Sequence, residues 1–308
     1  MTVKLDIIDS LSLPGSPDKA NEDRLGHAEH VAFVIDGATG LGDRRYMQSH
    51  DSDAAWLAEF AARHFLGLTD TGETTAIDAV SELNRAARAA FFEAAAADLV
   101  PRYAWPSAGF AMIRAIGDRI EFCGLGDCKA LLLRQDGEVE IHSALGDFFT
   151  AEGEAAARQL SRLGRFHSGS LLGDAETLAG LRAARERHNT PQSGIWTLGM
   201  VEEAGQHVQT ARLPASDYIL VLLCSDGFSS LADAYGHYTP RELMQAASQN
   251  GLAPLGDEIR RIERKIDPDG IRFPRFKQSD DASALLAKIK AERPANPGRL
   301  QGQTQRYA

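Results

Sequence analysis

Acidic residues stand at four separate places where predicted strands begin or end. These places are Glu22 with Asp23, Asp36 before Gly37, Asp226 before Gly227, and Asp280 with Asp281. Carboxylates that gather in space repel one another unless a cation or a proton compensates them. Because no His or Cys alternates with these acids, the donors are oxygens, which favours Mg²⁺ or Mn²⁺ over zinc or copper. The pattern therefore predicts a centre for hard divalent cations.

A single Asp-Gly pair has a simpler explanation, since this dipeptide is common in turns. Asp136 with Gly137 is such a pair between two predicted strands, and nothing around it indicates chemistry. Each acid taken alone is thus more often a turn residue than a ligand. The metal hypothesis depends on the recurrence of the pattern.

The order of five short motifs strengthens the hypothesis, because it resembles that of the type 2C, metal-dependent (PPM) protein phosphatases. The motifs are Asn21-Glu22-Asp23, Val34-Ile35-Asp36-Gly37, Gly126-Asp127-Cys128-Lys129, Leu223-Cys224-Ser225-Asp226-Gly227 and Asp280-Asp281-Ala282-Ser283. They occupy the chain from about Asn21 to Ile289. The resemblance implies an α+β fold, a four-layer α-β-β-α sandwich with two central, mostly antiparallel sheets.

The resemblance also implies the metal ligands. Asp36 resembles the carboxylate that bridges two Mn²⁺ or Mg²⁺ ions, and the backbone carbonyl of Gly37 would bind the second ion. Asp226 and Asp280 resemble the remaining ligands of the first ion.

The chemistry implied by the resemblance is hydrolysis of phosphoserine or phosphothreonine in a protein. A hydroxide bound to both ions attacks the phosphorus directly, so no side chain is expected to act as the nucleophile. Glu22 and Asp23 resemble the residues that hold metal-bound waters in this family.

Two positions depart from the family pattern. Many members have a His directly after the first Asp-Gly that would protonate the leaving group, and this chain has Ala38. The family usually places an Arg three residues before the Asn of the first motif, where it would bind the substrate phosphate, and Asp18 stands there. The candidate phosphate-binding cations are instead Lys19, Arg44 and Arg45.

A third metal site, present in some relatives, would need Asp127 and a further Asp soon after Asp226. Ser229 and Ser230 occupy that stretch. Asp127 is therefore a weaker candidate ligand, and its alternative role is to cap backbone amides in a loop.

The composition of the chain excludes several other functions. It has 308 residues, 44% hydrophobic and 25% charged, which is enough for a sizeable core. Its 43 acidic and 33 basic residues give a formal charge of −10, which disfavours binding to nucleic acid. The odd count of three cysteines indicates neither a disulfide framework nor a zinc site, and a reducing cytoplasm fits best. Neither a signal peptide nor an apolar run of about 20 residues is found, so no membrane association is expected.

Hydrophobic periodicity predicts the elements that position the acids. We expect helices at 51–68, at 74–99 with Pro101 closing it, at 240–250 after a capping box, and at 257–265. We expect strands at 3–8, 30–35, 195–197, 208–211, 218–224 and 280–289. The segment 110–142 predicts an antiparallel meander with hairpin turns at Gly117-Asp118 and Asp136-Gly137.

One phosphatase domain is expected at 1–290, with a variable excursion at 146–190 and a disordered polar tail at 291–308. The excursion has no clear core strand. Loops beside such sites often determine specificity, so this segment is a candidate for substrate selection.

Two alternatives to a protein phosphatase stay open. A pseudophosphatase would keep the fold but bind a partner or a phosphorylated ligand, which Ala38 and Asp18 favour. A hydrolase of small phosphoesters is the other, because nothing in the sequence indicates a peptide-binding groove. The expected partners of an active protein phosphatase are a phosphoserine or phosphothreonine protein and a cognate kinase, with no nucleic acid and no membrane.

Overall fold

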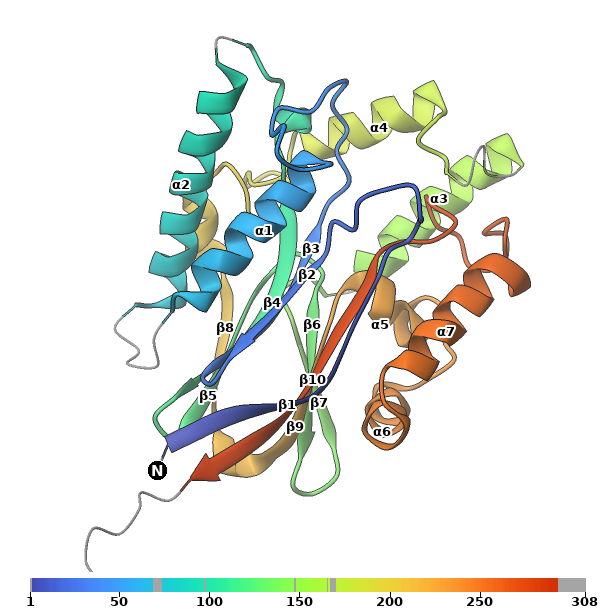
Figure 1. Ribbon diagram of the computed structural model, residues 1–308. Coiled ribbons are helices and arrows are strands. Elements are labelled where there is room, and N and C mark those ends of the chain that lie inside the picture. Colours follow the sequence, from blue (N-terminus) through green and yellow to red (C-terminus); the bar gives the residue numbers. More distant parts are fainter. Residues whose placement is uncertain are drawn as a thin grey trace, which may run out of the picture.

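The computed structural model describes residues 2–68, 74–96, 98–146, 148–164, 166 and 170–292 (Figure 1). Its strands are β1 (Thr2–Leu13), β2 (Arg24–Ala28), β3 (Val31–Gly37), β4 (Ala108–Ile116), β5 (Arg119–Leu125), β6 (Lys129–Arg134), β7 (Val139–Ser143), β8 (Gln209–Pro214), β9 (Tyr218–Cys224) and β10 (Ala282–Glu292). They form two five-stranded sheets: sheet A has the order β1-β10-β9-β6-β7, and sheet B has β2-β3-β4-β5-β8. All the pairings between these strands are antiparallel.

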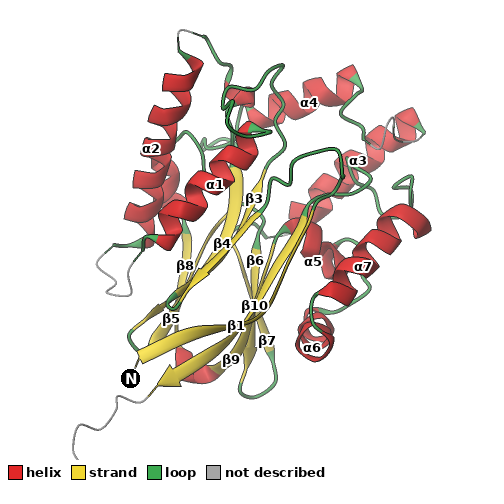
Figure 2. Ribbon diagram, in the orientation of Figure 1, coloured by secondary structure: helices red, strands yellow, loops and turns green. Residues whose placement is uncertain are grey.

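Helices cover the outer face of each sheet (Figures 1 and 2). Sheet B lies against α1 (Asp53–Leu66) and α2 (Ala76–Ala95), and sheet A lies against α5 (Asp226–Asp233), α6 (Pro240–Asn250) and α7 (Ala253–Arg261). The excursion forms α3 (Phe148–Leu163) and α4 (Ala175–Arg185). The predicted four-layer sandwich is therefore confirmed. No described helix is long and apolar enough to cross a membrane.

Three hydrophobic clusters hold the four layers together. Along β3, Phe33 and Ile35 face the helices of sheet B, whereas Val34 faces sheet A. This strand is apolar at successive positions because both of its faces are buried. Leu222 and Leu286 face the helices of sheet A. Burying a side chain of this size stabilises the fold by about 1.5–3 kcal/mol.

The predicted helix starts agree with the structure where a side chain caps the first turn. Thr239 and Glu242 form the predicted capping box of α6, with both reciprocal hydrogen bonds present. Thr75 accepts from the backbone N–H of Asp78 at the start of α2. However, α2 ends at Ala95 and does not continue to Pro101. Leu99 is fully exposed, so a further turn would bury nothing.

The predicted meander was wrong, because its strands are divided between the sheets. The hairpins at Gly117 and Gly137 do form, within sheet B and sheet A respectively. The turn between β5 and β6, at residues 126–128, instead passes from sheet B to sheet A. It therefore joins the two layers rather than two neighbouring strands.

Other boundaries also differ from the sequence prediction. Residues 195–197 form no strand, and only Leu198 makes an isolated bridge, to Ala108. The predicted helix at 257–265 begins earlier, at Ala253, and becomes a π-helical turn after Arg261. Strand β2 and helix α5 were not predicted, because each is short. Strand β10 continues to Glu292, past the predicted domain end, and the rest of the predicted tail lies outside the described residues.

The turn between the sheets gives a direct test of this packing. Gly126 has a φ of 73°, and a Cβ there would lie 2.7 Å from the Cα of Gly109. Gly117 has a similar φ of 63° but open space around it. We expect Gly126→Ala to lower the free energy of unfolding by about 3 kcal/mol or more, and Gly117→Ala by about 1 kcal/mol. Urea unfolding curves measure both, and equal losses would contradict a role for the close approach to Gly109.

Candidate metal centre and active site

The five acidic motifs meet at one end of the sandwich, although they come from different sheets. Asp36 is the second-last residue of β3, and Asp23 directly precedes the paired strand β2, both in sheet B. In sheet A, Asp226 follows β9 and Asp281 precedes its neighbour β10. Asp127 lies in the turn that joins the sheets. Antiparallel pairing brings the end of one strand beside the start of the next, and this places all the acids at the same edge.

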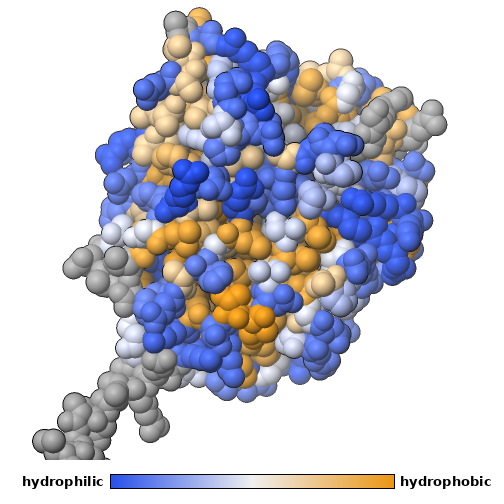
Figure 3. Space-filling view, viewed as in Figure 1, coloured by the Kyte–Doolittle hydropathy of each residue, from blue (hydrophilic) through white to orange (hydrophobic). Residues whose placement is uncertain are grey.

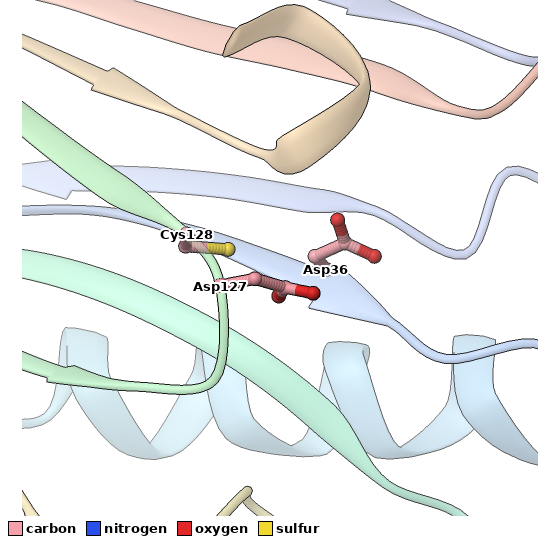
Figure 4. A group of neighbouring side chains, drawn as sticks. All are labelled: Asp36, Asp127 and Cys128. Carbon is pink, nitrogen blue, oxygen red and sulfur yellow. The ribbon is translucent and has the colours of Figure 1, made fainter. Parts of the chain in front are cut away.

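Asp36, Asp127 and Cys128 form a compact group of side chains that could hold a metal ion (Figure 4). Their carboxylate oxygens and thiol sulfur all lie within 4.8 Å of one another. Burial, and then the negative charge of Asp36, raises the pKa of the Cys128 thiol well above its usual value. The thiol therefore stays protonated, and thiolates rather than thiols bind metals. The donors that this group offers are oxygens.

Burial and mutual repulsion hold protons on these carboxyl groups when no cation is bound. Burial raises the pKa of Asp36 well above its ordinary value, and the neighbouring charge of Asp226 raises it further. The side chains of Asp36 and Asp226 interact closely enough for each to shift the pKa of the other. Burial is also the main cause of the raised pKa of Asp127. Such a set of groups is expected to exchange its protons for divalent cations.

Asp23 gives independent support for a cation at this edge. Its side chain is 2% exposed, and neither carboxylate oxygen has a partner with hydrogen-bond geometry among the described residues. Burial, followed by repulsion from Asp281, raises its pKa to about 8, although the hydroxyl groups of Ser283 and Ser225 lie near enough to lower it slightly. An unpaired buried carboxyl group is costly, and a metal-bound water donating to it would remove that cost.

Glu22 is held in place by two hydroxyl groups. Ser52 donates to its Oε1 at 2.6 Å and Thr39 donates to its Oε2 at 3.0 Å. Ser52 also caps α1 by accepting from the backbone N–H of Ala55, so the start of this helix fixes the carboxylate. Burial raises the pKa of Glu22, whereas the hydrogen bond from Ser52 lowers it.

Asp281 is a structural residue of the site that the sequence did not assign. It accepts from the backbone N–H of Gly15 at 2.7 Å and from that of Glu22 at 2.6 Å. It therefore ties the first motif to the last one. The sequence shows two adjacent aspartates, and only these contacts distinguish the structural one from Asp280.

Two glycines allow the acidic segments to touch. A Cβ on Gly37 would lie 2.6 Å from the backbone oxygen of Glu22, and one on Gly227 would lie 2.0 Å from that of Asp281. Both neighbours are backbone atoms, so they cannot move aside cheaply. Any larger residue would push Asp36 or Asp226 away from the other acids.

Residues 16–260 match the sequence model of a family described as protein phosphatase 2C. The chain belongs to the protein phosphatase 2C family. It is a metal-dependent protein serine/threonine phosphatase, and it uses two Mn²⁺ or Mg²⁺ ions. Its substrates are phosphoproteins. No curated protein sequence matches this chain.

Solved structures share the fold of this protein phosphatase 2C. The Mycobacterium tuberculosis serine/threonine phosphatase PstP/Ppp is 19% identical, with 94% of this chain and 100% of that chain covered and a TM-score of 0.52. Staphylococcus aureus Stp1 is 14% identical, with 94% of this chain and 98% of that chain covered and a TM-score of 0.54. The catalytic domain of PstP in complex with two manganese ions is 18% identical, with 94% of this chain and 99% of that chain covered and a TM-score of 0.51. These identities are low, so the likeness concerns the fold.

The residues present in this phosphatase fit a pair of divalent cations. Asp36, Asp127 and Asp226 supply half-buried carboxylates whose pKa values are raised, and Asp23 supplies two buried oxygens that no side chain or backbone group in the described residues hydrogen-bonds. Oxygen donors of this kind suit Mn²⁺ and Mg²⁺.

A pocket of about 930 Å³ opens beside the acids of the phosphatase. Lys19, Arg44 and Arg45 all line it, together with Glu22 and Asp280. The three predicted cations therefore line the same pocket as Glu22 and Asp280.

The contacts of the predicted phosphate-binding cations are with residues other than the predicted metal ligands. Arg44 pairs with Asp98 and stacks over the ring of Tyr46, and Arg45 lies 3.9 Å from Asp51. Lys19 is exposed.

The excursion contributes two charged residues that sequence reasoning missed. Glu152 of α3 lines a second cavity, of about 280 Å³, together with Asp226 and Asp280. Burial, then the charges of Asp127 and Asp280, raises the pKa of Glu152 to about 7. Arg185 of α4 donates to the hydroxyl of Ser107 at 3.4 Å. Alanine-rich helices contain many such charges, and no local pattern marks these two.

Figure 3 shows that the hydropathy of this face of the phosphatase changes from top to bottom. Hydrophilic residues cover the loops at the upper, acidic end of the sandwich, whereas hydrophobic residues gather lower down, over β1 and β10. Ile8 of β1 is 52% exposed. The charged end is therefore the end suited to an ionic substrate.

Proposed function

We propose that this phosphatase hydrolyses phosphoserine or phosphothreonine with Asp36, the carbonyl of Gly37, Asp226 and Asp280 as metal ligands. The observation that carries the assignment is the convergence of acids from both sheets at one edge, where Asp36 and Asp226 lie close enough to shift each other's pKa. The two ions supply an activated water and neutralise the phosphoryl oxygens.

The other acids support this centre. Glu22 and Asp23 hold waters of the metal centre: Glu22 is oriented by Thr39 and Ser52, and Asp23 has two free buried oxygens. Asp127 is the candidate ligand of a third ion. Glu152 would be its companion there, in place of the missing Asp after Asp226, since the charge of Asp127 acts on it.

Lys19, Arg44 and Arg45 remain candidates for binding the substrate phosphate. All three line the 930 Å³ pocket, which is large enough for a phosphorylated side chain with part of its backbone. This size supports a protein substrate over a small phosphoester. Nothing in the site favours a pseudophosphatase, because every predicted metal ligand is present at the same edge.

The wider biology follows from the same assignment. We expect a cognate serine/threonine kinase that supplies the phosphorylated substrate, and a cytoplasmic location, consistent with three buried free cysteines. Residues 1–290 are expected to form one catalytic domain, since β1 and β10 from the two ends pair along their whole length.

The test compares hydrolysis of phosphoserine, phosphothreonine and phosphotyrosine peptides, phosphorylated metabolites and an aryl phosphate. Each is assayed with Mn²⁺, with Mg²⁺ and with chelator. We expect metal-dependent turnover that favours the phosphoserine and phosphothreonine peptides and is lost in Asp226→Asn. Faster turnover of metabolites than of peptides would overturn the protein substrate. Binding of a phosphopeptide without any turnover would revive the pseudophosphatase.

A further inference from the structure

Lys277 places an ammonium group in contact with a predicted metal ligand, Asp280. Its Nζ donates to Oδ1 of Asp280 at 2.6 Å and to the hydroxyl of Thr39 at 3.0 Å. Thr39 in turn donates to Glu22, so Lys277 is connected to acids of both sheets. Lys277 and Asp280 also line both the 930 Å³ pocket and the 280 Å³ cavity. The Lys277 side chain therefore borders both the pocket and the second cavity.

The contacts of Lys277 leave room for a further partner. An ammonium group has three N–H donors, and the described residues accept two of them. On the other side, Oδ1 of Asp280 already accepts from Lys277 and from the backbone N–H of Asp281 at 2.9 Å. Oδ2 is left to bind a metal. Lys277 can thus stay on Asp280 while Asp280 acts as a ligand.

No other cation of the pocket is placed in this way. The others that line it are Lys19, Arg44, Arg45 and Arg264. Within the part of the chain that the structure describes, none of these donates to a predicted metal ligand. Arg264, for example, donates to the backbone oxygen of Gly15 at 3.1 Å. Lys277 is therefore the pocket cation closest in contact with the centre.

We propose that Lys277 binds the phosphoryl group of the substrate, in place of the arginine that the family has where this chain has Asp18. This inference rests on the proposed function of the same site. A phosphoryl group bound at the predicted metal ligands would lie beside the ammonium, which is held by its bonds to Asp280 and Thr39 and keeps a third donor to offer. As a point charge, Lys277 supplies attraction without the bidentate geometry of arginine.

The test uses Lys277→Gln, which removes the charge, and Lys277→Arg, which keeps it. Lys265→Gln is the matched control, because Lys265 is an exposed lysine of the same C-terminal region that does not line the pocket. Inorganic phosphate is measured as a competitive inhibitor, and its binding to the Mn²⁺-loaded protein is measured by calorimetry. Calorimetric titration with Mn²⁺ and thermal unfolding are run on every variant.

We expect Lys277→Gln to weaken phosphate binding and raise KM about 10- to 100-fold, as for loss of a charged hydrogen bond. The affinity for Mn²⁺ should not fall, since a cation next to Asp280 is being removed. Lys277→Arg should recover most of the phosphate affinity, and Lys265→Gln should match the wild type.

Three results would overturn the proposal. One is unchanged phosphate affinity in a folded Lys277→Gln variant. Another is a loss of Mn²⁺ affinity that accounts for the whole effect, because Lys277 would then act only on the metal site. The third is a defect seen with phosphoserine peptides but not with aryl phosphates or phosphate inhibition, which would indicate proton donation to the leaving group. Failure of the proposed function itself is recognised separately, by a wild type that shows no metal-dependent turnover.

Discussion

Replacing Asp36 by Asn is expected to abolish phosphatase activity and, at the same time, to stabilise the metal-free protein. Asp36 is the predicted bridge between the two ions, so its loss should lower kcat/KM by about 1,000-fold or more, corresponding to several kcal/mol of transition-state stabilisation. Without metal, however, burial and the neighbouring charges of Asp226, Asp23 and Asp127 penalise the ionised carboxylate of Asp36 and hold a proton on it, which destabilises the fold at this pH. Removing it should raise the free energy of unfolding by about 1–3 kcal/mol at pH 8.

The measurements are phosphopeptide turnover with Mn²⁺ and thermal unfolding in chelator. Asp136→Asn is the matched control, because Asp136 also precedes a glycine but lies in the exposed hairpin between β6 and β7. It should change neither activity nor stability appreciably. If Asp36→Asn lowered the melting temperature of the metal-free protein, the account of uncompensated repulsion would be wrong.

Removing the metal is expected to make stability fall as the pH rises. The pKa of Asp23 is raised from an ordinary value near 3.8 to about 8, and that of Glu152 from 4.5 to about 7. Between the ordinary and the raised pKa of each group, the folded state holds more protons than the unfolded state. The free energy of unfolding therefore decreases with increasing pH in this range. The stabilisation is complete below about pH 4 and is lost by about pH 8, and the total change is on the order of several kcal/mol.

Unfolding curves between pH 5 and pH 8, with chelator and with Mn²⁺, measure this effect. Saturating Mn²⁺ should remove most of the slope, because the cations then compensate the carboxylates in place of protons. Asp23→Asn should reduce the slope in chelator, since it deletes one of the two carboxyl groups, Asp23 and Glu152, that cause it. Equal slopes with and without Mn²⁺ would show that the protons concerned are not at the metal centre.

Much of the fold was visible in local sequence patterns. The periodicity of 51–68 and 74–99 predicted the two helices over sheet B, and the capping box at Thr239 predicted the start of α6. Strand β9 was predicted with its observed bounds, because it is an uninterrupted apolar run. These features depend on neighbours within a few residues, and the chain shows them directly.

The division of strands between sheets was not visible in this way. The turns at residues 117–118 and 126–128 both separate apolar strands, yet only the second crosses between layers. The difference depends on what each strand meets far along the chain: β5 pairs with β8, and β6 pairs with β9. Periodicity carries no information on such partners, which is why the meander prediction failed.

For the candidate site, the sequence alone determined which acids are present and in what order, and it predicted oxygen ligands for hard cations. It could do so because each acid follows or precedes a strand end, a position that local pattern marks. Only the tertiary structure decided that Asp281 ties loops together, that the excursion brings Glu152 and Arg185 to the acids, and that Lys277 contacts Asp280. Each of these residues acts through contacts with residues that are far away in the sequence. A single charge in a loop or on a helix has no spacing of its own by which the sequence could reveal it.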